Sequence, residues 1–236
     1  MPLFSFVVIA YNVSSYIEAC LNSLKNQQGA DYEVIVVNDA SVDDTLDVIH
    51  KCVADDDRFH VIDKKINGGA HLARRDGVLA SIGRFVVFVD GDDELSPSFC
   101  ELMGPYVTAH QSDIVRFGRC VVSTRLENDA SVIANETMFN AALSSVVKNE
   151  PILPYIFSDE YNPRLTWSII DIVFQGEFVR SCFRKMTSDR LGRMQDSYEM
   201  FVLCANARKF ETITDFRGLH YHFGNGCSGN AEETAE

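Results

Sequence analysis

The sequence lacks any hydrophobic run long enough to cross a bilayer, and basic residues are scarce. Its longest apolar stretches, such as residues 85–89, are far shorter than the roughly 20 residues of a membrane-spanning helix. No Lys or Arg precedes the first apolar stretch, so a secretory signal peptide is unsupported. Lys and Arg total 21 against 34 Asp and Glu, for a formal net charge of -13. We expect no intrinsic membrane span and no nucleic-acid partner, because so acidic a surface repels anionic lipid and phosphate backbones.

Familiar cysteine and nucleotide-binding motifs are also missing. No two of the seven cysteines form a C-x-x-C pair, and four lie among apolar residues: Cys20, Cys100, Cys182 and Cys204. This pattern is typical of buried thiols in a reducing compartment, so we expect a cytoplasmic protein. No G-x-G-x-x-G follows the first apolar strand and no G-x-x-x-x-G-K-[ST] occurs. Neither a Rossmann dinucleotide site nor a P-loop is therefore supported.

Apolar runs and helical patterns alternate through the first hundred residues. The runs at 4–10, 32–37, 59–62 and 85–89 predict strands. Helical spacing predicts helices from Ser14 or Ser15 to about Gly29, from Asp43 or Asp44 through Val53, and over 70–81. Strands that are apolar throughout and alternate with helices predict an α/β fold with a doubly wound, mostly parallel sheet. Such sheets bind ligands at the carboxyl ends of their strands.

The second half of the chain is less regular. We predict strands over 113–124 and near 132–133, and helices over 139–147, 176–183 and 195–207. In the last helix, the periodicity turns four residues inward: Tyr198, Phe201, Val202 and Ala205. Residues 224–236 are rich in Gly, Ser and Glu, and we expect a mobile tail there. No repeat or linker divides the chain, so residues 1–236 are predicted to form a single domain.

Three carboxylates within four residues, Asp90, Asp92 and Asp93, follow a predicted buried strand. Their mutual repulsion is relieved by a positive partner, and Mg²⁺ or Mn²⁺ prefers such oxygen ligands. An acidic turn that caps the following helix explains the cluster equally well.

Other polar residues near the predicted strand ends have two interpretations each. Asp39 either accepts hydrogen bonds from a base or ribose, or caps the helix that follows it. Arg74 either neutralises a diphosphate or lies on the surface. Asp196 begins a helix, so it is either a general base or an ordinary N-terminal carboxylate. His222 lies two residues after His220 in an extended segment, and either approaches a metal or is structural.

Six segments of the chain, in order, resemble the motifs of one protein family. VVNDASVDDT (36–45) is similar to V-D-D-G-S-x-D-x-T, and NGG (67–69) with ARRDG (73–77) is similar to N-x-G…A-R-N-x-G. FVDGDD (88–93) resembles F-x-D-x-D-D, and QD (195–196) lies where the family has Glu-Asp at the start of a helix. The opening strand (6–12) ends in Tyr-Asn, and HYHF (220–223) with Ser228 resembles the family's closing segment. The chain thus resembles the family 2 glycosyltransferases of the GT-A fold, bacterial enzymes that extend surface polysaccharides.

The resemblance implies an inverting transfer of a sugar from a nucleotide diphosphate donor, most often a UDP-sugar, to a hydroxyl of a glycan or lipid-linked saccharide. It implies that Asp196 is the general base and that Asp39 hydrogen-bonds the nucleotide base. Mn²⁺ or Mg²⁺ is the implied cofactor, on the donor's diphosphate. The implied donor-binding residues are Ala10, Tyr11, Asn12, Asp39, Arg74, Asp90 and Gly91, and the implied metal ligands are Asp92 and His222.

The resemblance also implies a GT-A fold, with a Rossmann-like sheet and a smaller acceptor-side subregion. Residues 1–97 would form the nucleotide-sugar-binding half and residues 98–223 the acceptor-binding and catalytic-base half. Because the chain ends soon after the expected catalytic segment, we expect either a further C-terminal region or a homo-oligomer. Peripheral attachment at the inner face of the cell membrane would depend on that region or on a partner.

Several positions depart from the family's pattern. Ala10 replaces a proline, Asn38 an Asp, Arg75 an Asn, and Gln195 the Glu before the expected base. The segment around residues 167–171 lacks the usual Trp-x-Lys. One alternative is therefore a degenerate GT-A domain that binds nucleotide or a partner without turnover. A nucleotidyltransferase is a second alternative, but the Gly-rich basic loop that it needs after the first strand is absent.

Overall fold

The computed structural model describes residues 1–123, 130–144, 152–158 and 166–223. Its first half alternates strands with helices, as the apolar runs predict. The strands are β1 (Phe4–Ala10), β2 (Tyr32–Asn38), β3 (Phe59–Asp63) and β4 (Phe85–Asp90), and the helices are α1 (Ile17–Lys25), α2 (Thr45–Val53) and α3 (Gly69–Ala80).

The second half contributes short elements and two long strands. In chain order they are β5 (Glu94–Leu95), α4 (Phe99–His110), β6 (Ile114–Ser123), α5 (Ala130–Ala141), the 3₁₀ turn η1 (Ala142–Ser144), α6 (Leu153–Phe157), β7 (Ile172–Gln175), α7 (Gly176–Lys185), α8 (Gln195–Asn206) and β8 (Phe210–Phe223).

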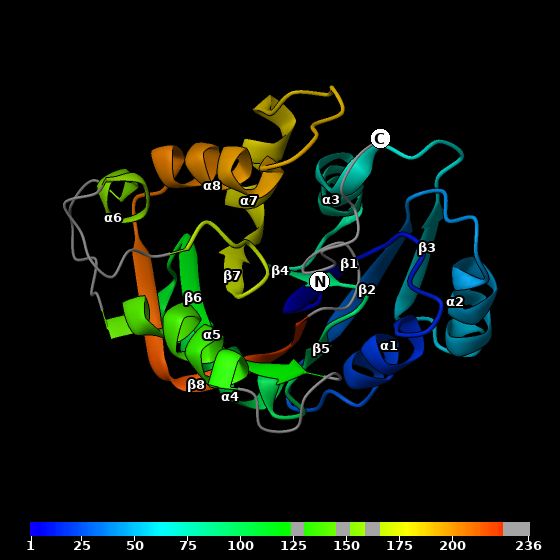
Figure 1. Ribbon diagram of the computed structural model, residues 1–236, viewed down its shortest axis with the longest axis horizontal. Helices are drawn as coiled ribbons and strands as arrows, with labels where there is room; N and C mark the ends of the chain where they lie inside the picture. Colours follow the sequence, from blue (N-terminus) through cyan, green and yellow to red (C-terminus); the bar gives the residue numbers. More distant parts are fainter. Residues whose placement is uncertain (124–129, 145–151, 159–165, 224–236) are drawn as a thin grey trace.

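One curled sheet of eight strands runs through the described part of the molecule in the order β3-β2-β1-β4-β7-β6-β8-β5 (Figure 1). Strands β3, β2, β1 and β4 are parallel to one another, and β6 is parallel to β8. Strand β7 is antiparallel to both of its neighbours, as is β5 to β8. The parallel part therefore places the carboxyl ends of β1, β2 and β4 side by side.

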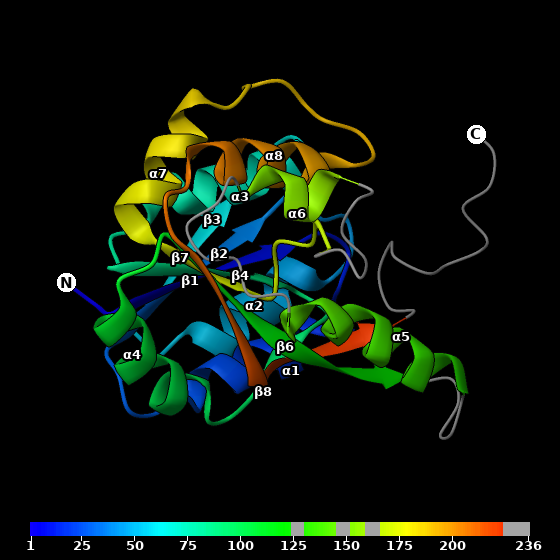
Figure 2. The same ribbon diagram turned by 90° about the vertical axis from the view of Figure 1, so that its left-hand side faces the viewer.

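Helices cover both faces of the sheet, which explains why β1, β2 and β4 are buried along nearly their whole length and mostly apolar. Helices α3, α7 and α8 lie on one face, and α1 and α4 lie on the other (Figure 2). Helix α1 buries Ile17, Cys20, Leu21 and Leu24, at helical spacing. Helix α3 lies against β1 and β2 and also contacts α7 and α8. The end of the sheet where β1, β2 and β4 stop is therefore bordered by the beginning of α3 and by α8.

Two predictions for the second half are wrong. The strand predicted near 132–133 is part of helix α5, which begins at Ala130, nine residues before the helix predicted over 139–147. Residues 145–147 of that predicted helix, and the tail at 224–236, lie outside the described residues. Helix α5 lies against β6, where Asn140 accepts a hydrogen bond from the Arg119 backbone at 3.0 Å and Glu136 accepts one from that of Val121 at 2.9 Å. These contacts outweigh the weak β preference of Val132 and Ile133.

The inward face predicted for the helix at 195–207 is only partly right. Tyr198 and Val202 are half-buried against the core, but the fully buried residues of α8 are Glu199, Met200, Leu203 and Cys204. Phe201 is 51% exposed. The hydropathy pattern misassigns the face because one of the buried side chains is a carboxylate.

Among the described residues, no helix combines the length and the apolar character that crossing a bilayer requires.

Candidate active site

A cleft of ≈ 390 Å³ opens where β1, β2 and β4 end. It is bordered by the first turns of α3 and α8 and by the segment 190–192 before α8. Eight residues of the predicted site line it: Ala10, Tyr11, Asp39, Arg74, Asp90, Gly91, Asp92 and Asp196. Asn12 and His222 do not line this cleft. The parallel-sheet rule thus brings together most of the residues that the sequence suggested.

Asp39 fixes the beginning of α3 at the edge of the cleft. Its carboxylate accepts hydrogen bonds from the backbone N–H groups of Gly68 at 2.9 Å and Gly69 at 2.7 Å, and it pairs with Lys64 at 2.8 Å. Gly69 has φ +77°, a conformation that favours glycine, and its Cα faces the carbonyl of Leu191. Asp39 therefore caps α3, rather than the helix that follows it in the chain, and it also lines the cleft. Its contact with a base or ribose stays a prediction.

The loop after β1 is tied to the loop after β2. Asn12, with φ 53°, donates its backbone N–H to Ser41 Oγ at 3.1 Å, and its Oδ1 accepts from the Val42 N–H at 2.9 Å. Tyr11 is left 43% exposed at the cleft. Asn12 thus shapes the cleft from outside its lining, whereas Tyr11 offers a ring to a ligand.

The three carboxylates after β4 have different surroundings. Asp93 is buried; its Oδ1 accepts the His222 backbone N–H at 2.8 Å, and its Oδ2 has no partner among the described residues. Burial, reinforced by Asp90, raises the pKa of Asp92 to about 6. The closely packed Gly91, whose substituent would lie 3.0 Å from the Ile9 carbonyl, holds the turn against β1. Asp90 and Asp92 face the cleft, whereas Asp93 anchors β8.

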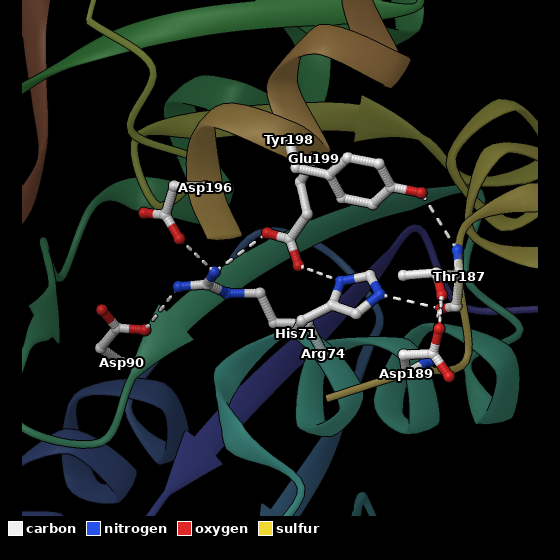
Figure 3. Close-up of polar contacts among 8 residues, drawn as sticks. All are labelled: His71, Arg74, Asp90, Thr187, Asp189, Asp196, Tyr198 and Glu199. Carbon is white, nitrogen blue, oxygen red and sulfur yellow. Dashed lines mark hydrogen bonds and ion pairs between the residues drawn. The ribbon is translucent and has the colours of Figure 1, made fainter. Parts of the chain in front are cut away.

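Arg74 joins the carboxylates of the cleft into one network (Figure 3). Its Nη1 lies 2.5 Å from Asp196 Oδ1 and 3.0 Å from Glu199 Oε2, and its Nη2 lies 3.4 Å from Asp90 Oδ1. Burial opposes the charge on Arg74, but the three carboxylates outweigh it and raise the pKa of the guanidinium. Arg74 is therefore a permanent cation whose donors already serve protein carboxylates.

Behind this network lies a buried His–Glu pair that sequence reasoning missed. His71 Nδ1 lies 2.8 Å from Glu199 Oε1, and Nε2 lies 3.0 Å from the Thr187 carbonyl oxygen (Figure 3). Both side chains are 0% exposed. The signal for Glu199 was its i, i+3 spacing from Asp196, which places both carboxylates on the same side of α8.

Arg190 is a second cation that sequence reasoning missed. It lines the cleft, and its guanidinium donates to Asn67 Oδ1 at 3.3 Å. No carboxylate lies within ion-pair distance of Arg190 in the part of the chain that the structure describes. Unlike Arg74, it is free to meet an anionic ligand. Nothing in the sequence marks it, because it lies in an irregular segment before α8.

The chemistry of the cleft fits a hard cation only in part. No three His, Cys, Asp or Glu side chains within the described residues converge on a single ion. His222 lies with Glu94 instead, at 3.0 Å from Nε2 to Oε1. Two carboxylates, Asp90 and Asp92, do face the cleft, and Mg²⁺-type ions in nucleotide sites take one or two carboxylates with phosphate and water oxygens. The donor set therefore fits an ion that arrives with a phosphorylated ligand.

Residues 5–175 match the family described as glycosyl transferase family 2. The chain therefore belongs to this family, which confirms the resemblance of its motifs. The match spans β1 through β7 and includes all the cleft carboxylates except those of α8.

A relative in sequence and a neighbour in structure support the same family and fold. The chain is 26% identical to a GalNAc(5)-diNAcBac-PP-undecaprenol beta-1,3-glucosyltransferase of Campylobacter jejuni, over 86% of this chain and 72% of that protein. It superposes on TarS of S. aureus in complex with UDP-GlcNAc with a TM-score of 0.75, at 21% identity, over 98% of this chain and 62% of that one. This likeness confirms the GT-A fold.

A neighbour that holds a metal is more distant. The mannosyltransferase PcManGT of Pyrobaculum calidifontis, in complex with GDP-Man and Mn²⁺, superposes with a TM-score of 0.65 at 16% identity, over 92% of this chain and 56% of that one.

Two Bacillus subtilis glycosyltransferases are 40% and 37% identical over 43% and 50% of this chain. The matched segments span only 29% and 34% of the length of those relatives.

Proposed function

We propose that this chain transfers a sugar from a nucleotide diphosphate donor to a saccharide hydroxyl, with inversion, in the synthesis of a bacterial surface polysaccharide. The observation that carries the proposal is the position of Asp196. Its carboxylate lines the cleft and is bound at 2.5 Å by the buried cation Arg74. Its side chain is 29% exposed, so the carboxylate is accessible as a proton acceptor next to the strand ends, where sheets of this kind bind ligands.

The donor would lie along the carboxyl ends of β1, β2 and β4. Tyr11 offers its exposed ring to the base, next to Asp39. Arg190 supplies the free cation for the diphosphate, since Arg74 is occupied by three carboxylates. We take UDP as the nucleotide, since the neighbour TarS binds UDP-GlcNAc.

Asp90 and Asp92 would hold Mn²⁺ or Mg²⁺ on the donor. Bound there, such an ion neutralises the negative charge that develops on the departing diphosphate. The carboxylates contribute oxygen ligands, and Arg190, which lines the same cleft, adds positive charge. His222 is not required for this proposal, because it is engaged by Glu94.

Catalysis by the chain's own groups then consists of positioning and proton transfer. The acceptor hydroxyl attacks the anomeric carbon from the side opposite the diphosphate, and Asp196 takes the hydroxyl proton. The acceptor class is a saccharide, and the Campylobacter relative supports a lipid-linked one.

The six cysteines that the structure describes are free thiols, which supports a reducing, cytoplasmic setting.

Turnover of UDP-sugars by wild type and by Asp196→Asn tests the proposal. A general base contributes about 10²–10⁴-fold, so kcat should fall by that factor while UDP binding, measured by calorimetry, is retained. Asp47→Asn, an exposed carboxylate on α2, is the matched control and should leave kcat unchanged. Undiminished turnover by Asp196→Asn would refute the assignment, and UDP binding without turnover by wild type would favour the degenerate binding domain.

A further inference from the structure

Both ring nitrogens of His71 face hydrogen-bond acceptors. Nε2 lies 3.0 Å from the carbonyl oxygen of Thr187, which carries no proton, so Nε2 must donate. Nδ1 lies 2.8 Å from the carboxylate oxygen Oε1 of Glu199. A neutral imidazole has only one N–H, so one further proton must lie between His71 and Glu199. Burial works against a charged imidazole, but the hydrogen bonds to Glu199 and Thr187 outweigh it and raise the pKa of His71.

The same pair touches the proposed base through one nitrogen atom. Arg74 Nη1 is shared between Asp196 Oδ1 and Glu199 Oε2, at 2.5 and 3.0 Å. Glu199 therefore competes with Asp196 for the same donor. A cation on the other oxygen of Glu199 weakens that competition, because it neutralises part of the carboxylate's charge.

Few charges surround this cluster. Helix α3 contributes His71 and Arg74, the end of β4 contributes Asp90, and α8 contributes Asp196 and Glu199. Helix α7 contributes the Phe183 ring, which is stacked on the imidazole with centroids 6.2 Å apart. The Tyr198 ring packs edge-on at 5.7 Å, and its hydroxyl accepts the Thr187 N–H at 3.1 Å. With His71 as an imidazolium, two cations face three carboxylates.

We propose that His71 and Glu199 are positioning residues for proton transfer: a protonated His71 occupies Glu199, so that Arg74 stays on Asp196 and holds that carboxylate in place at the cleft. This inference rests on the proposed role of Asp196 as the general base. Neither residue touches substrate in this account. They act through Arg74, and their effect should appear in the pH dependence of turnover.

Charge accounting separates the variants. His71→Asn removes a buried cation next to Glu199, so the cluster around Arg74 and Asp196 becomes one charge more negative. The acid limb of the kcat profile should move up by about one pH unit, as expected for a change in neighbouring charge, with little change in the donor KM. His71→Asn/Glu199→Gln removes one charge of each sign, so its acid limb should return to that of wild type. A purely structural role would lower kcat in both variants without moving the acid limb up in His71→Asn and back to its wild-type position in the double variant.

A direct measurement needs no activity. In ¹⁵N-labelled wild type, the two His71 ring nitrogens should report an imidazolium at pH 7.5, with the signals assigned by their absence in His71→Asn. In Glu199→Gln the same signals should become those of a neutral ring, because the anionic partner is gone. Glu211→Gln, which alters the exposed pair of Glu211 with His110, is the matched control and should leave the His71 signals unchanged.

The outcomes separate the two proposals. A neutral His71 in the wild type, or an acid limb that His71→Asn leaves in place, overturns the positioning role even if Asp196→Asn is inactive. Full turnover by Asp196→Asn overturns the proposed base even if His71 is an imidazolium. The wild-type spectrum, assigned with His71→Asn, decides the charge of His71 even if Glu199→Gln or the double variant fails to fold.

Discussion

Asp92 illustrates, at the scale of one residue, a stability cost at the proposed donor site. Burial and the neighbouring Asp90 raise its pKa to about 6, from the 3.8 of a free side chain. A raised carboxyl pKa means that the folded state binds the proton more tightly than the unfolded state. Stability is therefore lost as pH rises from about 4 to about 6, and the loss is complete above that range.

Replacing this charge should stabilise the protein. At pH 7.5 in the presence of a chelator, Asp92→Asn should have a larger free energy of unfolding than wild type, by up to ~3 kcal/mol for a shift of about two pKa units. Urea unfolding measures it, and the difference should shrink at pH 4, where wild-type Asp92 is protonated. Asp47→Asn, at an exposed position, should show no such gain. Equal stability of Asp92→Asn and wild type at both pH values would contradict the account.

Arg74 has the opposite effect on stability. It is 2% exposed and balances Asp196, Glu199 and Asp90. Arg74→Met should lower the free energy of unfolding by about 3–5 kcal/mol, because it removes the one cation that Asp196, Asp90 and the buried Glu199 share. Arg75→Met is the matched control, since its neighbouring, half-buried side chain makes no ion pair among the described residues. Chemical denaturation of the two variants at pH 7.5 compares them, and equal losses would show that the network does not stabilise the fold.

At the scale of elements, α3 is the part that both positions the site and packs on the sheet. Gly77 is where it lies closest to the strands: an added Cβ would overlap Val7 Cγ1 and lie 3.2 Å from Val37 Cγ2. The same helix carries His71, Arg74 and the N-terminus held by Asp39. A shift of α3 away from β1 and β2 would therefore displace the residues of this helix that form the cleft and its ion-pair network.

Gly77→Ala tests this close packing. Alanine favours a helix by up to about 1 kcal/mol over glycine, but overpacking against the sheet typically costs about 1–3 kcal/mol. We expect a net loss of stability in thermal unfolding and a lower kcat. Gly192→Ala is the control for stability alone, because nothing lies within 4 Å of the added Cβ but the residue lines the cleft. A Gly77→Ala protein as stable and as active as wild type would show that the helix can move without consequence.

Helix α8 also shows which features of an element its own sequence does not predict. Its existence follows from its pattern, but its buried face does not, since Glu199 counts as polar in any hydropathy scale. What buries Glu199 is an ion pair with residues of α3, more than a hundred positions away in the sequence. Helix α4 escaped prediction for a local reason, since Gly104 and Pro105 interrupt its pattern. Long-range charge pairing and irregular helices are the features that one sequence does not reveal.

At the scale of the whole molecule, the parallel half of the sheet and the residues at its strand ends were predictable. Apolar strands alternating with helices determine that half, and the family's motifs assign roles to Asp39, Asp90 and Asp92. The curled half was not predictable in detail, because β6 pairs with β7 and β8, and β8 with β5, across long stretches of chain. Arg190 escaped for the same reason: only the folded chain brings the segment before α8 to the end of β1.

Those two halves meet at the cleft, so a donor that bridges them should stabilise the entire fold. UDP at a hundred times its dissociation constant should add about 2.7 kcal/mol, or roughly 5–10 °C in Tm for a chain of this size. Mn²⁺ should be required, because the acidic cleft otherwise repels the diphosphate. The measurement is a thermal-shift series of UDP, GDP, CDP and dTDP, each with and without Mn²⁺, on wild type and Asp92→Asn.

Each arm of the series isolates one part of the site. In Asp92→Asn, adding Mn²⁺ should no longer increase the Tm shift that UDP produces. In Arg190→Gln, the Tm shift with UDP and Mn²⁺ should be smaller than in wild type, since the variant lacks the free cation of the cleft. Arg208→Gln, an exposed arginine after α8, is the control for loss of charge. If Asp92→Asn responds to UDP and Mn²⁺ as wild type does, the ion does not depend on this carboxylate. A Tm shift with GDP and none with UDP would leave the proposed site in place but make the donor a GDP-sugar. The diphosphate contacts are common to both nucleotides, and only the base contacts near Tyr11 and Asp39 distinguish them.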